Sequence, residues 1–361
     1  MRVLQFARLS AALLALASTA LAGCGRDSTA PDAPFDAGGT SADVEAVAAS
    51  FEAPAMESYA AMSAEIGAAV GGSAAAAVRS HPTAAIASGK PGALRYAASL
   101  GRTYEAGRIR PSFSAAPIPA EYAGTTFAYD VATSGYVASD LTGAPESGVR
   151  FLLYAVNPVH GVPVEPLSQV GYADITASET GSTSTVRIVV VSGGETYLDY
   201  AVAATESSSA VSVTVTGFAT NGTDRANFDL DNRVTGSLSS LDVVVDYLLT
   251  IPTRGNFRIE MEAGTEDIFS QSPTTTLGLE ARGEHGTVGI NGSMAGEAGS
   301  FNVQVNGNLF ATITLNGNAE PVVTGAGGQP LTEEELATVR AVFAIFIEGG
   351  DIFEDLTDPL S

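Results

Sequence analysis

The chain has 361 residues, with 40 acidic and 17 basic side chains, a formal net charge of −23 at pH 7 and no tryptophan. Nucleic acid and anionic lipid surfaces repel such a charge, which excludes them as partners held by electrostatic attraction. Cys24 is the only cysteine, which excludes an internal disulfide and a cysteine-bound metal cluster. A hydrophobic core must therefore hold the fold, and the length allows one large domain or two smaller ones.

Residues 1–23 have the three parts of an export signal. Arg2 and Arg8 supply the positive start, residues 9–21 form an apolar centre, and small residues follow at the end. The apolar run is shorter than the about 20 residues that a membrane-spanning helix needs. We therefore expect residues 1–23 to be a signal peptide.

Leu21, Ala22, Gly23 and Cys24 resemble the lipobox of bacterial lipoproteins, a pattern of Leu, two small residues and Cys. The resemblance covers only the first 24 residues. It implies a thioether between the Cys24 thiol and diacylglycerol, cleavage before Cys24, and acylation of the new amino group by a fatty acid such as palmitate. A thiolate is the side-chain nucleophile suited to this alkylation. An ordinary export leader with an incidental cysteine is the alternative.

The lipobox resemblance also implies a location. A lipid-anchored chain belongs to the cell envelope, with the bilayer as its partner through acylated Cys24. Gly25 follows that cysteine, where enteric lipoproteins kept in the inner membrane carry Asp, so the resemblance implies the outer membrane. It leaves open whether the chain faces the periplasm or the surface.

Two segments precede the strand-like part of the chain. Residues 24–40 combine Cys24 with a stretch rich in Pro, Gly, Asp, Ser and Thr, which is typical of a flexible tether. Residues 41–115 are Ala-rich and lack strand alternation, so we expect helices there.

The first expected helix opens at Ser41 or Asp43 and ends near Pro54. Its apolar residues are Val44, Val47 and Phe51. A second helix has one stripe, which consists of Met56, Tyr59, Ser63, Ile66 and Val70 and ends at Gly71-Gly72. We interpret the stripe as packing against a β domain rather than lying on a membrane, because the polar face lacks Lys and Arg.

From about residue 120 the hydrophobic period changes to two, and about thirteen or fourteen strand-like runs follow. In residues 257–263, for example, Phe257, Ile259 and Met261 alternate with polar and acidic residues. Short turn signals separate the runs, among them Ser192-Gly193-Gly194, Asn221-Gly222, Thr253-Arg254-Gly255-Asn256, Asn306-Gly307-Asn308 and Asn316-Gly317. Such spacing leaves no room for crossover helices, so residues 116–361 are predicted to form an antiparallel meander.

A large sheet with one apolar face needs a cover. Residues 332–347 are predicted to be a helix, because Thr332 and Glu335 stand in capping-box positions. Its apolar positions are Leu336, Val339, Val342, Phe343 and Phe346. The predicted fold class is therefore mainly β with flanking helices (α+β): a large antiparallel meander, as a curved sheet or open barrel, covered by N- and C-terminal helices.

No constellation of residues indicates catalysis, a metal site or a cofactor. His81, His160 and His285 are dispersed, and zinc needs three or four converging ligands. "NGSMAG" (291–296) is interpreted as a turn rather than a nucleophile elbow, and "GAGGQP" (325–330) as a linker rather than a phosphate loop. The acidic pairs Asp229/Asp231 and Asp242/Asp246 are interpreted as solvated strand faces rather than calcium or glycosidase sites.

Two functions are compatible with these features. The first is a membrane-anchored, non-catalytic envelope lipoprotein that holds an apolar ligand under its helices, against residues such as Phe257, Met261, Phe301 and Phe343. The alternative is a structural or interaction lipoprotein with a filled core and an envelope protein as partner. No residue can be assigned to ligand binding from the sequence.

Overall fold

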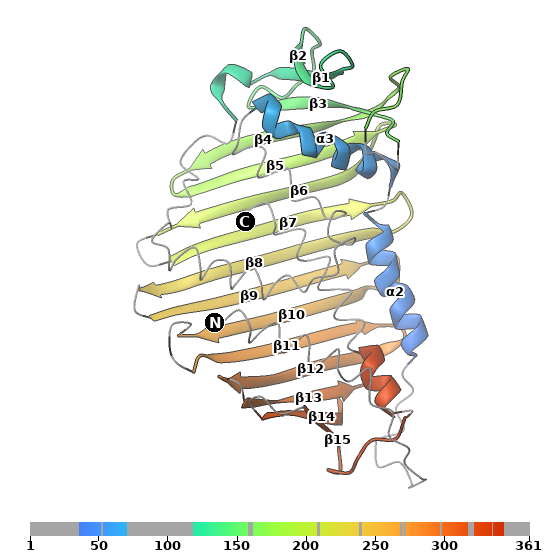
Figure 1. Ribbon diagram of the computed structural model, residues 1–361, viewed down its shortest axis with the longest axis vertical. Coiled ribbons are helices and arrows are strands. Elements are labelled where there is room, and N and C mark those ends of the chain that lie inside the picture. The colour runs from blue at the N-terminus through green and yellow to red at the C-terminus, as the bar shows by residue number, and fades with distance from the viewer. Residues whose placement is uncertain are drawn as a thin grey trace.

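A single open sheet dominates the computed structural model of the protein (Figure 1). The model describes residues 36–51, 53–70, 118–157, 162–207, 210–237, 240–267, 270, 272–296, 298–316, 321–333 and 335–342. The strands in chain order are β1 (Thr125–Asp130), β2 (Gly135–Ser139), β3 (Gly148–Tyr154), β4 (Gln169–Thr180), β5 (Thr183–Ser192), β6 (Glu195–Glu206), β7 (Ala210–Thr220), β8 (Arg225–Ser237), β9 (Ser240–Ile251), β10 (Phe257–Glu266), β11 (Thr274–Gly283), β12 (Gly286–Ala295), β13 (Ala298–Val305), β14 (Asn308–Asn316) and β15 (Val322–Gly325).

The predicted meander is confirmed from β3 to β15, where each strand pairs antiparallel with the next one along the chain. Each strand-like run of the sequence forms a strand, and the structure contains one further strand, β15, that was not predicted. The edge beyond β3 differs from the prediction, because β1 lies parallel to β3 and β2 forms the edge. A loop after β2 (140–147) is long enough to carry the chain past β1 and to reverse its direction.

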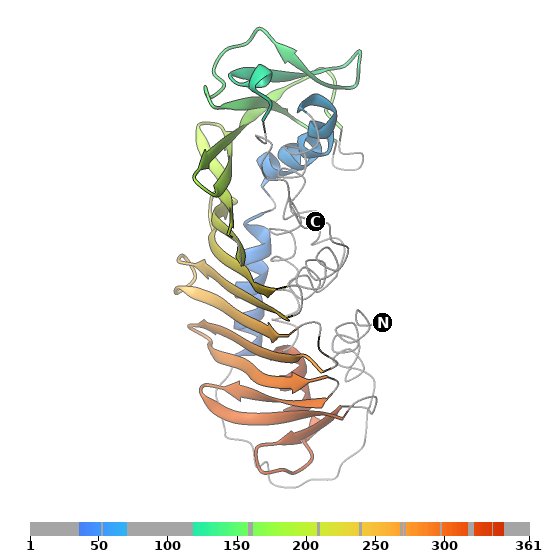
Figure 2. The same cartoon turned by 90° about the vertical axis from the view of Figure 1, so that its left-hand side faces the viewer.

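Alternation along the strands divides the sheet into two faces. On β9, Val243, Val245, Tyr247 and Leu249 are all at most 3% exposed, whereas Asp246 on the other face is exposed. The same alternation continues on neighbouring strands, so the described part of the chain has one extended apolar core on one face of the sheet. Figure 2 shows that the described helices lie on one side of the twisted sheet.

The predicted turns are hairpins where the structure describes them. Ser192-Gly193-Gly194 joins β5 to β6, and Asn306-Gly307 joins β13 to β14. Both residues of the second turn have a positive φ, 50° at Asn306 and 78° at Gly307. This is the conformation of a two-residue turn whose twist matches the strands, and it explains the Asn-Gly pair there. Gly317 lies outside the described residues.

Helix α2 (Ala37–Ala49) begins earlier than the sequence predicts. Asp36 is its N-cap and accepts a hydrogen bond from the main-chain N–H of Gly39 at 2.9 Å, so neither Ser41 nor Asp43 starts the helix. Residues 37–40 of the expected tether are therefore helical. Val44, Val47 and Phe51 are buried, as the sequence predicts.

Helix α3 (Pro54–Val70) packs against β2 to β6. Pro54 is its first residue, where the missing N–H removes no helical hydrogen bond. Met56, Tyr59 and Ser63 of the predicted stripe are at most 5% exposed, which confirms packing against the sheet for this part of the stripe. The remaining predicted positions, Ile66 and Val70, have side chains outside the described set.

The capping box near the C-terminal end of the described chain is confirmed. The main-chain N–H of Glu335 donates to the Thr332 hydroxyl at 3.2 Å, and the Thr332 N–H donates to the Glu335 carboxylate at 2.7 Å. Residues 335–342 are helical, and Val339 and Val342 are buried. Phe343, Phe346 and the predicted helix end at 347 lie outside the described residues.

Candidate functional site

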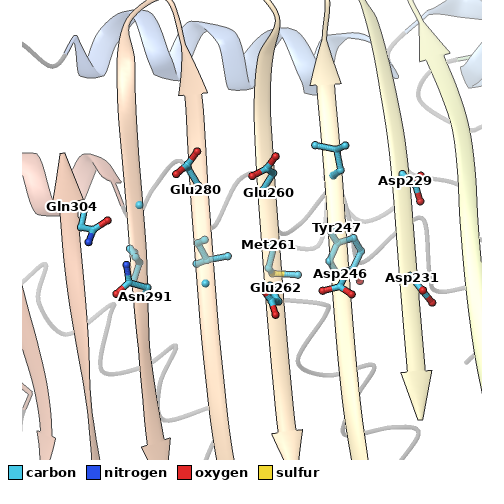
Figure 3. A pocket seen from close by; sticks show the side chains of 15 residues that line it. Asp229, Asp231, Asp246, Tyr247, Glu260, Met261, Glu262, Glu280, Asn291 and Gln304 are labelled. Carbon is cyan, nitrogen blue, oxygen red and sulfur yellow. The ribbon is translucent and has the colours of Figure 1, made fainter. Parts of the chain in front are cut away.

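The structure describes a groove on the polar face of the sheet, across β8 to β13 (Figure 3). Its volume is about 520 Å³. Alternation on each strand sends every second side chain to this face, and the antiparallel register aligns these side chains in rows across the strands. The side chains of this face that line the groove are Asp229, Asp231, Asp246, Leu248, Glu260, Glu262, Glu280, Asn291 and Gln304.

The register arranges the carboxylates in two rows. In the first row, Asp231 pairs with Asp246, and Asp246 pairs with Glu262. In the second row, Glu260 pairs with Glu280. Carboxylates that lie directly opposite each other on paired strands repel one another, so the rows destabilise the free protein. A positively charged group in the groove would relieve this repulsion.

Two glycines make the groove hollow. Gly278 continues the first row after Glu262, and Gly289 continues the second row after Glu280. Both glycines line the groove. With no side chain at either position, the floor there is main chain flanked by carboxylates and by the amides of Asn291 and Gln304.

Arginines neutralise only one corner of the groove. Arg258 lies 3.3 Å from the Glu260 carboxylate and 3.8 Å from that of Glu280, and Arg282 lies 3.7 Å from that of Glu280. No ion pair to the other four carboxylates, those of Asp229, Asp231, Asp246 and Glu262, is formed within the described ranges. Elsewhere on the sheet, Asp174 and Asp199 each have an arginine partner, Arg150 and Arg187 respectively, both at 2.7 Å.

The pKa of Asp246 is raised above its ordinary value. Partial burial is the largest cause, and the charges of Glu262 and Asp231 on the two neighbouring strands add to it. Asp246, at the middle of the first row, therefore binds a proton more readily than an ordinary aspartate does.

The sequence predicted the acidic residues but not their grouping. Asp229, Asp231 and Asp246 were expected as solvated strand faces, and they meet with glutamates of β10 and β11 in one groove. Asp242 lies outside it and accepts a hydrogen bond from the main-chain N–H of Asp267 at 3.0 Å. Among the described residues, no three His, Cys, Asp or Glu side chains are arranged to hold a metal ion.

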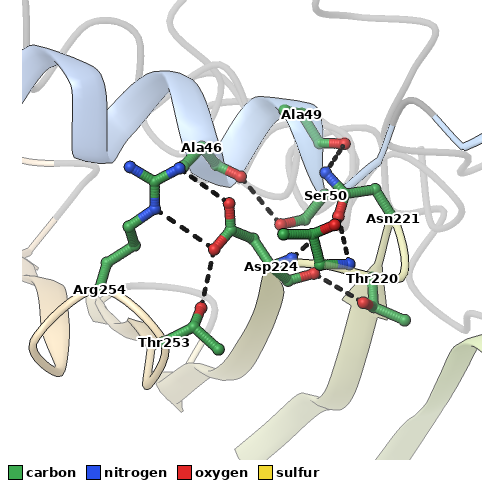
Figure 4. A network of polar contacts seen from close by, with 9 residues as sticks. Ala46, Ala49, Ser50, Thr220, Asn221, Asp224, Thr253 and Arg254 are labelled. Atoms are coloured by element: carbon green, nitrogen blue, oxygen red, sulfur yellow. Dashed lines mark hydrogen bonds and ion pairs between the residues drawn. The ribbon is translucent and has the colours of Figure 1, made fainter.

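A second polar cluster connects α2 to the turns of the sheet (Figure 4). The amide of Asn221 donates to the carbonyl of Ala49 at 3.2 Å, at the C-terminal end of α2. The Asp224 carboxylate, which is in the same turn, accepts hydrogen bonds from the Thr253 hydroxyl at 2.8 Å and from Arg254 at 3.0 Å. The Arg254 contact is the main reason why the pKa of Asp224 is lowered.

His285 lies at the other end of α2. Its Nδ1 is 3.3 Å from the Asp36 carboxylate, and its Nε2 is 3.9 Å from that of Asp43. Burial raises the pKa of Asp43, and the charge of His285 partly offsets this shift. These contacts could not be predicted from the sequence, because the residues are far apart in the chain. His81 and His160 lie outside the described residues.

Several other predicted positions can be located. Phe257 and Phe301, the expected ligand contacts, are buried in the core, and Met261 is partly buried against it. Residues 291–295 belong to β12, so the interpretation of "NGSMAG" as a turn is wrong except at Gly296. Their alternation is weak because Gly292 has no side chain, which hides the strand in the sequence. The lipobox residues and Cys24 lie outside the described part of the chain.

Sequence reasoning missed Asn232 on the apolar face. It is 2% exposed, and neither its Oδ1 nor its Nδ2 has a hydrogen-bond partner among the described residues. The signal was present in the alternation of β8, where Ala226, Phe228, Leu230 and Val234 are apolar and Asn232 interrupts the series.

The chain matches no protein-family model, no curated protein and no solved structure. Within the described ranges, the helices are too short or too polar to span a bilayer.

Proposed function

We propose that this chain is a non-catalytic, lipid-anchored protein of the cell envelope, whose acidic groove binds a positively charged segment of an envelope protein partner. The anchor is acylated Cys24, and the lipobox residues Leu21, Ala22 and Gly23 before it support this part of the proposal. The outer membrane is the favoured location. The observation that carries the binding function is the pair of carboxylate rows, in which four carboxylates lack an arginine partner within the described ranges.

The arrangement favours an extended cationic partner over a single ion. Adjacent strands are about 4.8 Å apart, so the rows distribute the carboxylates along the sheet instead of converging them on one point. Successive lysine or arginine side chains of an extended segment can match that spacing. The space above Gly278 and Gly289 admits such side chains to the main-chain floor.

The test measures binding of a lysine decamer to the purified full chain by calorimetry. A variant with Asp231→Asn, Asp246→Asn and Glu262→Gln removes the first row, and binding is expected to weaken at least about tenfold. The matched control, Asp140→Asn, Glu179→Gln and Glu195→Gln, changes the net charge equally at exposed residues outside the groove. Equal losses in both variants would show that net charge rather than the groove attracts the peptide, and would refute the proposal.

A second candidate function is the holding of an apolar ligand on the opposite face of the sheet, under the helices. The unpartnered amide of Asn232 within the apolar core is the observation that favours it. The two functions use opposite faces of the sheet and are compatible with each other.

A further inference from the structure

Strand β2 forms one end of the sheet, and its outer edge pairs with no described strand (Figure 1). Its five residues read Gly-Tyr-Val-Ala-Ser, without a charged residue or a proline. Charged residues and prolines on an edge strand normally prevent it from pairing with a strand of another chain. Strand β2 lacks this protection, so its edge is a candidate interaction surface.

The side chains around this edge are apolar and exposed. Val137, in the middle of β2, is 40% exposed. Val131, in the turn before β2, is 41% exposed, and Leu141, just after β2, is 54% exposed. An added strand would bury these side chains in addition to forming main-chain hydrogen bonds. The edge thus offers both contributions on which strand addition depends.

The opposite end of the sheet is less suited to strand addition. Strand β15 has only four residues, Val322–Gly325. The chain folds back directly after it, and the main-chain N–H of Gly325 already donates to the carbonyl of Gln329 at 2.8 Å. We therefore place the interaction surface at β2.

A second copy of this chain fits the edge through the same strand. In an antiparallel pair, opposite residues have the same hydrogen-bonding direction, so a twofold axis between two copies of one strand passes through a residue. An axis at Val137 pairs all five residues of β2. Val137 then lies opposite its own counterpart, and the flanking residues pair as Tyr136 with Ala138 and Gly135 with Ser139.

The charges near the edge are compatible with this register. Asp140, the residue after β2, lies opposite Ser134, the residue before β2, so the two Asp140 side chains do not face each other. The carboxylate of Asp130 is held within its own turn, where it accepts hydrogen bonds from the Ala132 N–H at 3.1 Å and the Thr133 hydroxyl at 2.9 Å. A cationic partner, by contrast, would find no carboxylate on β2. The chemistry of the edge therefore favours a second uncharged strand.

We propose that β2 is a dimerisation edge, at which it pairs antiparallel with β2 of a second copy and joins the two sheets into one. The proposal goes beyond the binding functions above and depends on neither of them, because it uses neither the groove nor the apolar face. Five paired residues form a small interface, so the dimer is weak and its population depends on concentration.

Sedimentation velocity of the purified full chain with Cys24→Ser tests the proposal without a covalent acyl group. The sedimentation coefficient is expected to rise from that of a monomer to that of a dimer between low and high micromolar concentrations. Val137→Lys and Val137→Glu each place like charges opposite each other at the axis, and each should weaken the dimer by roughly threefold to tenfold. An equimolar mixture of the two variants should restore the dimer, because lysine then lies opposite glutamate.

The restoration by mixing separates edge pairing from a general effect of net charge. Val137→Lys lowers the negative charge of the chain, so an effect of net charge alone would strengthen the dimer instead. Val244→Lys is the matched control, because Val244 is 38% exposed but lies on β9, in the interior of the sheet. This control should leave the dimer unchanged.

Three results would overturn the proposal. The first is a monomer at every concentration, and the second is equal weakening by Val137→Lys and Val244→Lys. The third is growth beyond the dimer, because pairing of β2 with β15 of the next copy would leave an open edge at each end and would not close. Far-UV circular dichroism of each variant checks that the sheet is intact.

Discussion

At the scale of single residues, Asp246 has the least favourable charge in the groove. Its neighbours across the strands are Asp231 and Glu262, and its pKa is raised by burial and by these charges. A raised folded-state pKa means that the folded protein binds the proton more tightly than the unfolded chain does. The contribution of Asp246 to stability therefore falls as the pH rises from below 3.8, the ordinary value, through the raised folded-state pKa.

Asp246→Asn is therefore expected to stabilise the protein at pH 7, since it removes the charge that burial and the two neighbours oppose. The gain should shrink as the pH falls toward 3.8, where the carboxyl group is protonated in the folded protein. Urea unfolding at pH 7 and at pH 4 measures the gain in the free energy of unfolding at each pH. Asp140→Asn, at an exposed position outside the groove, controls for the change in net charge. An Asp246→Asn gain of the same size at both pH values would contradict the role of ionisation.

At the scale of elements, the first turn of α2 depends on a tertiary contact rather than on helix propensity. Residues 37–40 read Ala-Gly-Gly-Thr, and glycine disfavours helix by about 1 kcal/mol relative to Ala. Asp36 caps this turn, and its main-chain N–H also donates to the carbonyl of His285 at 3.3 Å. A side chain on Gly39 would overlap the His285 ring, whereas a Cβ on Gly38 would meet only the Asp36 carboxylate, at an ordinary contact distance of 3.5 Å. The close approach of helix and turn thus requires glycine at position 39.

The two glycines are expected to respond to alanine with opposite signs. Gly38→Ala should stabilise the protein by about 0.5–1 kcal/mol, because only helix propensity changes. Gly39→Ala should destabilise it, because the new methyl group displaces His285 from Asp36 and Asp43. Thermal unfolding measures both effects, and His285→Ala in the Gly39→Ala background should remove the penalty of the clash. Stabilisation by Gly39→Ala alone would disprove the contact.

At the scale of the whole molecule, one sheet presents two faces of opposite character. The polar face presents the acidic groove, and the apolar face, on the side of the helices, contains Asn232 (Figure 2). Because α2 begins at Ala37 rather than at Ser41 or Asp43, the segment available as a tether after Cys24 is shorter than the predicted 25–40. With Cys24 acylated as proposed, a shorter tether would keep both faces closer to the membrane surface.

Cys24→Ser tests the anchor. The variant is expected to move from the membrane to the soluble fraction and to lose incorporation of labelled palmitate, because serine lacks the thiolate to which the lipid would be attached. Fractionation and labelling of cells that express the full chain measure the two effects. A variant that stays in the membrane and is labelled as before would refute the lipoprotein assignment.

From the sequence alone one can predict strands β1 to β14, except the end of β12, the order of pairing from β3 onward and the capping box at Thr332. These are local features, since alternation, tight turns and caps depend on residues close together in the chain. The sequence alone did not determine the start of α2, where a contact with His285 outweighs the glycines. It also did not determine the parallel pairing of β1 with β3.

The candidate sites could not be predicted without the tertiary structure. The register places Asp231, Asp246 and Glu262 side by side, and a shift of one residue on any strand would have moved a carboxylate to the other face. In the sequence Asn232 is only an irregularity in an alternating strand, and the structure shows that its amide is buried in the core without a hydrogen-bond partner among the described residues. Both sites depend on which strands are neighbours and in what register, and these relations are set by the packing of the whole sheet.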